Sequence, residues 1–132
     1  MTEIALVFDE QGRIIRFHRP PGCTSCGIPD TRSLWETMWE WRERLGGVAH
    51  THPWSGTAGP SQTDVTTWRA CEQGLGKLLL WPIVTRSEVG YFVYNRVTGL
   101  YCRAGQPTFE ISGLGRLLEM SLENGQTQPA VG

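Results

Sequence analysis

Apolar residues open the chain in two short runs, residues 4–8 and 13–17, both rich in branched and aromatic side chains. The four residues between the runs include an Asp and a Gly, which suit a tight reversal of the chain. This pattern predicts a β-hairpin. Residues 19–30 then hold three prolines and two glycines, a composition typical of a loop, and Cys23 and Cys26 lie within it.

A helical pattern begins near Ser33. Ser33 and Glu36 have the spacing of a capping box, in which two side chains satisfy backbone N–H groups at the start of a helix. Trp35, Trp39 and Met38 suit the face of this helix that would pack on a sheet, which is the preferred interpretation. An aromatic platform for a partner, with Trp41 beside the other two tryptophans, is the alternative. We therefore predict a helix that continues to residue 45 and stops at two glycines. Its apolar positions recur at helical spacing at Leu34, Met38, Trp41 and Leu45.

Residues 48–52, with the sequence Val-Ala-His-Thr-His, predict a short strand after the two glycines. Side chains two positions apart on a strand point to the same face of the sheet. We therefore expect His50 and His52 to point the same way.

A second helix is predicted after the loop at residues 53–60. Ser61 can cap its amino terminus, and Asp64 lies in its first turn, where a carboxylate also suits the helix dipole. This helix should run to about residue 73. The remaining pattern predicts strands at 78–85, 90–95 and 100–102 and a last helix at 113–123.

Length and composition indicate one globular domain. The chain has 132 residues, of which 39% are hydrophobic and 19% charged. We expect this domain to span residues 1–123, followed by a flexible C-terminal tail at 124–132. The longest apolar stretch, residues 78–84, is too short to cross a bilayer, and no export signal is apparent. A cytoplasmic location is therefore expected, with the four cysteines as thiols.

Charge argues against nucleic acid as a ligand. The formal net charge is −1, and the twelve cationic residues are scattered along the sequence without a basic run. A chain with that distribution has no surface predicted to neutralise a row of phosphates.

Two imidazoles and one carboxylate form a candidate metal site. Side chains two apart on a strand stand roughly 6.5–7 Å apart, a span that the rings of His50 and His52 can close onto one ion. Asp64, on the following helix, supplies a third ligand. Three protein ligands leave the fourth tetrahedral position to water, as in catalytic zinc sites. Taken singly, each residue has an ordinary structural explanation, but these are two of only three histidines in the chain.

This pattern resembles the JAMM motif of the JAB/MPN metalloprotease family, which consists of a Glu, then His-Ser/Thr-His, seven residues and Ser-x-x-Asp. Here the motif reads His50-Thr51-His52, eight residues with Pro53 first, and then Ser61-Gln62-Thr63-Asp64. The resemblance implies that His50, His52 and Asp64 bind Zn²⁺ and that Ser61 helps to stabilise the oxyanion. It also implies an α/β fold of the JAB/MPN-like (cytidine-deaminase-like) type, a mixed β-sheet flanked by helices.

The family's glutamate, its general acid and base, stands just before the first apolar strand. Glu3 has that position here, directly before the apolar run at residues 4–8. Glu10 and Glu36 are the alternatives for this role, because only Met1 and Thr2 precede Glu3 where the family has a helix.

The expected activity is that of a zinc metalloprotease, an isopeptidase-like enzyme that hydrolyses a peptide or isopeptide bond. By resemblance, the bond follows the C-terminal tail of a ubiquitin-like or sulfur-carrier protein, and an activating-enzyme-like protein of the ThiF type is a further partner. One alternative is a non-catalytic JAB/MPN module that binds a ubiquitin-like partner. Another is a zinc hydrolase of a small amide; a deaminase would need His-x-Glu and Pro-Cys-x-x-Cys, which the sequence lacks.

Two further features have open interpretations. Cys23 and Cys26 have the spacing of half a zinc site, which His18 could join, or they are two free thiols in a loop. Trp54 either lines a substrate groove or folds back over its own loop.

Overall fold

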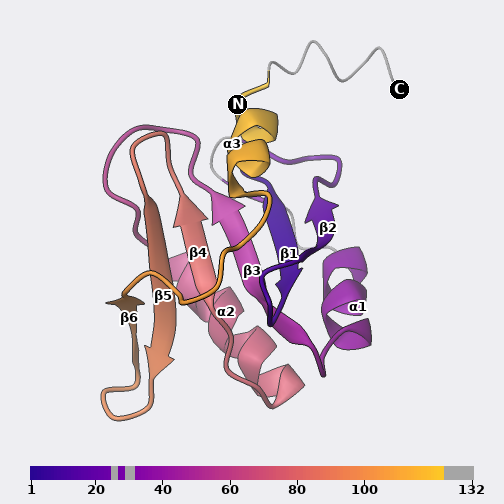
Figure 1. Ribbon diagram of the computed structural model, residues 1–132, viewed down its shortest axis with the longest axis vertical. Helices are drawn as coiled ribbons and strands as arrows, with labels where there is room; N and C mark the ends of the chain where they lie inside the picture. The colour runs from indigo at the N-terminus through magenta and orange to yellow at the C-terminus, as the bar shows by residue number, and fades with distance from the viewer. Residues whose placement is uncertain (25–26, 29–31, 124–132) are drawn as a thin grey trace.

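A six-stranded mixed β-sheet forms the centre of the protein in a computed structural model, which describes residues 1–24, 27–28 and 32–123 (Figure 1). The strand order is β2-β1-β3-β4-β5-β6; β3 and β4 are parallel, and the other neighbours are antiparallel. Along the chain the described elements are β1 (Ala5–Asp9), β2 (Ile14–His18), α1 (Arg32–Glu40), β3 (Leu45–Thr51), α2 (Gln62–Leu75), β4 (Trp81–Val84), β5 (Val89–Asn95), β6 (Leu100–Ala104) and α3 (Leu114–Leu122). The predicted α/β class with a mixed sheet is therefore confirmed.

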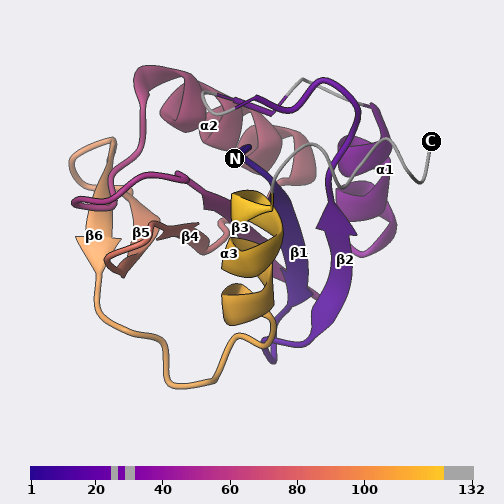
Figure 2. The same ribbon diagram turned by 90° about the horizontal axis from the view of Figure 1, so that it is seen from above.

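Helices cover both faces of the sheet, with α1 and α2 on one side and α3 on the other (Figure 2). Strand β1 lies between the two layers, and its residues alternate between two cores. Ala5 and Val7 pack in the core with α1 and α2, whereas Leu6 and Phe8 pack in the core with α3. This double burial explains why β1 is an unbroken apolar run rather than an alternating one.

Helix α1 is shorter than predicted. It ends at Glu40, and Leu45 begins strand β3, so the prediction of a helix to residue 45 is wrong. Ser33 lies inside the helix rather than at its N-cap position. The helical spacing of the apolar residues was misleading at Leu45. This residue is fully buried as part of a strand, and a single apolar position fits a helical pattern and a strand pattern equally well.

The two glycines after Leu45 belong to β3 and do not stop a helix. A Cβ atom on Gly46 would lie 2.3 Å from the Asp9 carbonyl oxygen, and one on Gly47 would lie 1.8 Å from the Leu80 carbonyl oxygen. Glycine is therefore needed here because neighbouring backbone comes too close for any side chain.

Gly47→Ala is expected to destabilise the protein by about 3 kcal/mol, lowering the melting temperature by roughly 10 °C. The methyl group would meet backbone atoms, so the chain beside β3 must move. Gly105→Ala is the control, because nothing lies within 4 Å of its added Cβ. Thermal unfolding of both variants measures the difference, and equal melting temperatures would contradict the close approach at Gly47.

The tryptophans of α1 are less buried than predicted. Trp35 and Trp39 are 37% and 45% exposed, and their rings stack on each other with centroids 6.1 Å apart. Met38 is fully buried and packs in the core below the helix, as predicted. A nine-residue helix presents a narrow face to the sheet, so the aromatic residues beside Met38 remain at its edge.

The remaining predicted elements agree with the structure to within a few residues. The hairpin of β1 and β2, helix α2, the strands β4, β5 and β6 and the terminal helix α3 are all present. The predicted tail at 124–132 lies outside the described residues. No helix in the described ranges is both long enough and apolar enough to span a membrane.

Candidate metal centre

Pairing between β1 and β3 places two histidines and one glutamate on the same face of the sheet. Ala5 lies opposite His50 in this antiparallel pair, and the Thr51 backbone N–H donates to the Ile4 carbonyl at 3.1 Å. Continuing that register places Glu3 opposite His52. Because residues two apart share a face, Glu3, His50 and His52 all point toward the layer of α1 and α2.

The first turn of α2 supplies the fourth member of the cluster. Ser61 is the N-cap, and its Oγ accepts the Asp64 backbone N–H at 3.0 Å. Asp64 Oδ2 in return accepts the Ser61 backbone N–H at 2.9 Å, which completes a capping box. These reciprocal bonds hold the Asp64 carboxylate toward His50 and His52 rather than toward solvent.

Three ligand atoms converge at the end of β3. His50 Nε2 lies 3.0 Å from His52 Nε2, and Asp64 Oδ2 lies 3.3 Å and 3.2 Å from these two nitrogens. Ligand atoms about 2.0–2.1 Å from one tetrahedral ion stand about 3.3 Å apart. The triangle therefore has the size that a metal ion requires, and the prediction that both imidazoles point the same way is confirmed.

Glu3 completes a buried cluster that can hold a metal ion. Its ligand atom and those of His50, His52 and Asp64 all lie within 4.8 Å of one another. The residue is only 5% exposed. Its backbone N–H donates to the Thr24 carbonyl at 2.7 Å, so the segment before β1 is held in place.

The two alternatives to Glu3 lie elsewhere. Glu10 is exposed beyond the opposite end of β1 and pairs with Lys77 at 3.2 Å. Glu36 is exposed on α1 and pairs with Arg32 at 3.4 Å. Neither belongs to the cluster, so Glu3 is the glutamate that the structure brings to the site.

The two carboxyl groups of the cluster have pKa values shifted in opposite directions, downward for Asp64 and upward for Glu3. Burial alone would raise the pKa of Asp64, but hydrogen bonds with His50 and His52 outweigh it and bring this pKa well below its usual range. Burial raises the pKa of Glu3, and the two nearby imidazoles only partly oppose that shift. One ligand carboxylate with two imidazoles is a suitable donor set for a divalent cation.

Aromatic rings border both histidines. The ring of Trp54 stacks on His52 with centroids 4.7 Å apart, and the buried ring of Trp68 meets His50 edge-on at 6.1 Å. Trp54 is still 44% exposed. The Trp54 ring therefore packs on His52 and leaves the residue partly exposed beside the cluster, and its place in a substrate groove stays a prediction.

Within the described ranges this cluster is the single group of three or more His, Cys, Asp and Glu side chains with metal-binding geometry. Cys23 is a free thiol, and Cys26 lies outside the described residues. The auxiliary site with His18 therefore stays a prediction.

Comparisons with protein-family models and with curated proteins found no match to this chain. The case for a metal centre therefore rests on the geometry of the cluster itself. Sequence reasoning named all four cluster residues, but it missed Trp68 and the polar residues that hold the loop before Ser61. No motif spacing marks them, since they come from α2, from the turn between β4 and β5 and from β6.

Proposed function

We propose that this protein is a zinc-dependent metallopeptidase that hydrolyses a peptide or isopeptide bond. The observation that carries the proposal is the convergence of His50, His52 and Asp64 with a fourth, buried acid, Glu3, beside them. Three ligands and one adjacent carboxylate form the residue set of a hydrolytic zinc site rather than of a closed structural one. The JAMM-like spacing of the same residues agrees with this assignment.

The three ligand residues would hold the ion. A zinc ion bound there supplies a Lewis acid that polarises a carbonyl group and lowers the pKa of water to about 7. The protein's contribution is to keep the donor atoms in place: the ladder between β1 and β3 holds the imidazoles, and the capping box holds the carboxylate.

Glu3 is suited to move the proton. Its carboxyl group lies within 4.8 Å of the ligand atoms, within reach of a reactant through one water molecule. We propose that it takes a proton from the attacking water and delivers it to the leaving amine.

Ser61 is the proposed oxyanion donor. Its Oγ accepts the Asp64 N–H, which leaves the hydroxyl hydrogen available for a substrate oxygen. Its exposure at the amino end of α2 keeps that hydrogen accessible.

The proposed substrate is a ubiquitin-like or sulfur-carrier protein with an extended C-terminal tail, processed in the cytoplasm alongside an activating-enzyme-like protein. Support comes from the family resemblance and from the open setting of Trp54, which offers an aromatic surface to a chain lying beside His52. An accessible aromatic ring beside the buried cluster suits a protein tail better than an enclosed pocket would.

Incubation with a ubiquitin-like protein fused through its C-terminal tail to a tag tests the proposal. We expect cleavage at the end of the tail, loss of cleavage after chelation and recovery when Zn²⁺ is restored. Mass spectrometry of the products locates the bond. Tight zinc binding without cleavage would favour the non-catalytic module, and hydrolysis of small amides alone would favour the alternative zinc hydrolase.

A further inference from the structure

The spacer at residues 53–60 connects the two halves of the candidate metal centre. His52, the residue directly after β3, precedes it, and Asp64 follows it in α2. The segment has no helix or strand of its own, and its middle is exposed. Its conformation therefore depends on what its backbone groups bind.

Ala58 is a buried residue of the spacer, and its backbone is bonded to two side chains from elsewhere in the chain. It is only 2% exposed, and a Cβ on Gly90 of β5 would meet its methyl group at 3.0 Å. Its backbone N–H donates to Glu88 Oε2 at 2.5 Å, and its carbonyl oxygen accepts from Arg103 Nη2 at 2.8 Å. Both polar groups of this buried peptide position are thus satisfied by side chains from outside the spacer.

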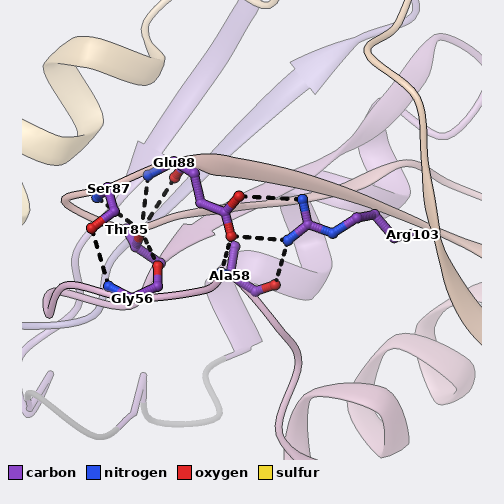
Figure 3. A network of polar contacts seen from close by, with 6 residues as sticks. All are labelled: Gly56, Ala58, Thr85, Ser87, Glu88 and Arg103. Atoms are coloured by element: carbon purple, nitrogen blue, oxygen red, sulfur yellow. Dashed lines mark hydrogen bonds and ion pairs between the residues drawn. The ribbon is translucent and has the colours of Figure 1, made fainter.

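Glu88 and Arg103 also bind each other, with Arg103 Nη2 3.0 Å from Glu88 Oε2 (Figure 3). The carboxylate accepts from Ala58 and from the guanidinium, and the guanidinium donates to Ala58 and to the carboxylate. This closed set of charge-assisted hydrogen bonds ties the spacer to the start of β5 and to β6.

The outer part of the spacer binds the turn between β4 and β5. The Gly56 N–H donates to Ser87 Oγ at 3.1 Å, and its carbonyl accepts from Thr85 Oγ1 at 3.1 Å (Figure 3). The Arg86 backbone N–H donates to the Trp54 carbonyl at 3.2 Å. This turn lies at the same end of the sheet as the end of β3 (Figure 1).

We propose that Glu88 and Arg103 are positioning residues of the metal centre. They hold Ala58, and through it they set where the chain leaves His52 and where it enters the helix that carries Asp64. The inference rests on the proposed function, because it assigns the pair to the assembly of that same zinc site.

The experiment separates the hydrogen bonds that hold Ala58 from the ion pair between Glu88 and Arg103. Glu88→Ala removes the acceptor for the Ala58 N–H, whereas Glu88→Gln keeps an acceptor and loses only the charge. Arg103→Met removes the donor while keeping a side chain to pack on Phe92, which the guanidinium overlies at 5.5 Å. Glu119→Ala is the control, because it breaks an exposed pair with Arg116 on α3 that does not contact the spacer.

Two readouts apply to the purified full chain: Zn²⁺ affinity by competition with a chromogenic chelator, and hydrogen–deuterium exchange of residues 53–60. We expect Glu88→Ala and Arg103→Met to bind Zn²⁺ about tenfold more weakly and to exchange faster in the spacer. Glu88→Gln should stay within about threefold of the wild type, less than the loss expected for a removed partner. The control should match the wild type in both.

Equal zinc affinity in the wild type and in Glu88→Ala would overturn the positioning role and leave the proposed function standing. A Glu88→Gln variant as weak as Glu88→Ala would overturn the route through Ala58, since that variant still offers an acceptor to the Ala58 N–H. A wild-type chain that binds no zinc would overturn the proposed function and the positioning role together.

Discussion

Purified protein is expected to carry about one zinc ion per chain, and His52→Ala or Asp64→Ala to lose most of it. Each variant leaves two protein ligands in place of three. In the unaltered protein the three ligand atoms lie 3.0–3.3 Å from one another. Metal analysis by mass spectrometry after dialysis measures the loss, and circular dichroism checks that both variants still fold.

His18→Ala is the matched control for the histidine variant. It is the third histidine of the chain, equally buried in the same sheet, and it lies outside the cluster. Asp64→Asn complements Asp64→Ala, because an amide oxygen can still accept the Ser61 N–H and preserve the cap while the ligand charge is lost. Full zinc retention in His52→Ala and Asp64→Ala would rule the site out.

Glu3→Gln is expected to keep its zinc and to lose turnover by about 10²–10⁴-fold. The amide has nearly the shape of the carboxyl group but cannot take up and return a proton. Because Glu3 is buried and its backbone is bonded to Thr24, the substitution should leave the position of the residue unchanged. The rate of fusion cleavage, normalised to zinc content, is the measurement.

Glu10→Gln and Glu36→Gln are the controls, since both acids are exposed, ion-paired and outside the cluster. Both should cleave the fusion at close to the wild-type rate. Unchanged hydrolysis by Glu3→Gln, together with a loss in either control, would transfer the proton-shuttle role to that residue.

Local pattern predicted the elements whose signals lie within a few neighbouring residues. The capping pair of Ser61 and Asp64 is a local motif, and the structure contains it with both hydrogen bonds. The alternation of a strand is equally local, so the common direction of His50 and His52 was predictable and is confirmed by their 3.0 Å separation. Leu45 was predicted wrongly because its burial comes from strands that are distant in sequence.

The sequence by itself determined the identity and spacing of the candidate ligands, the mixed α/β class and the fact that an acid precedes the first strand. Only the tertiary structure decided that Glu3, rather than Glu10 or Glu36, lies at the ligands, because that depends on the register of β1 against β3. It alone also decided that Glu88 and Arg103 hold Ala58. Register and long-range hydrogen bonds join residues dozens of positions apart, and no local pattern encodes them.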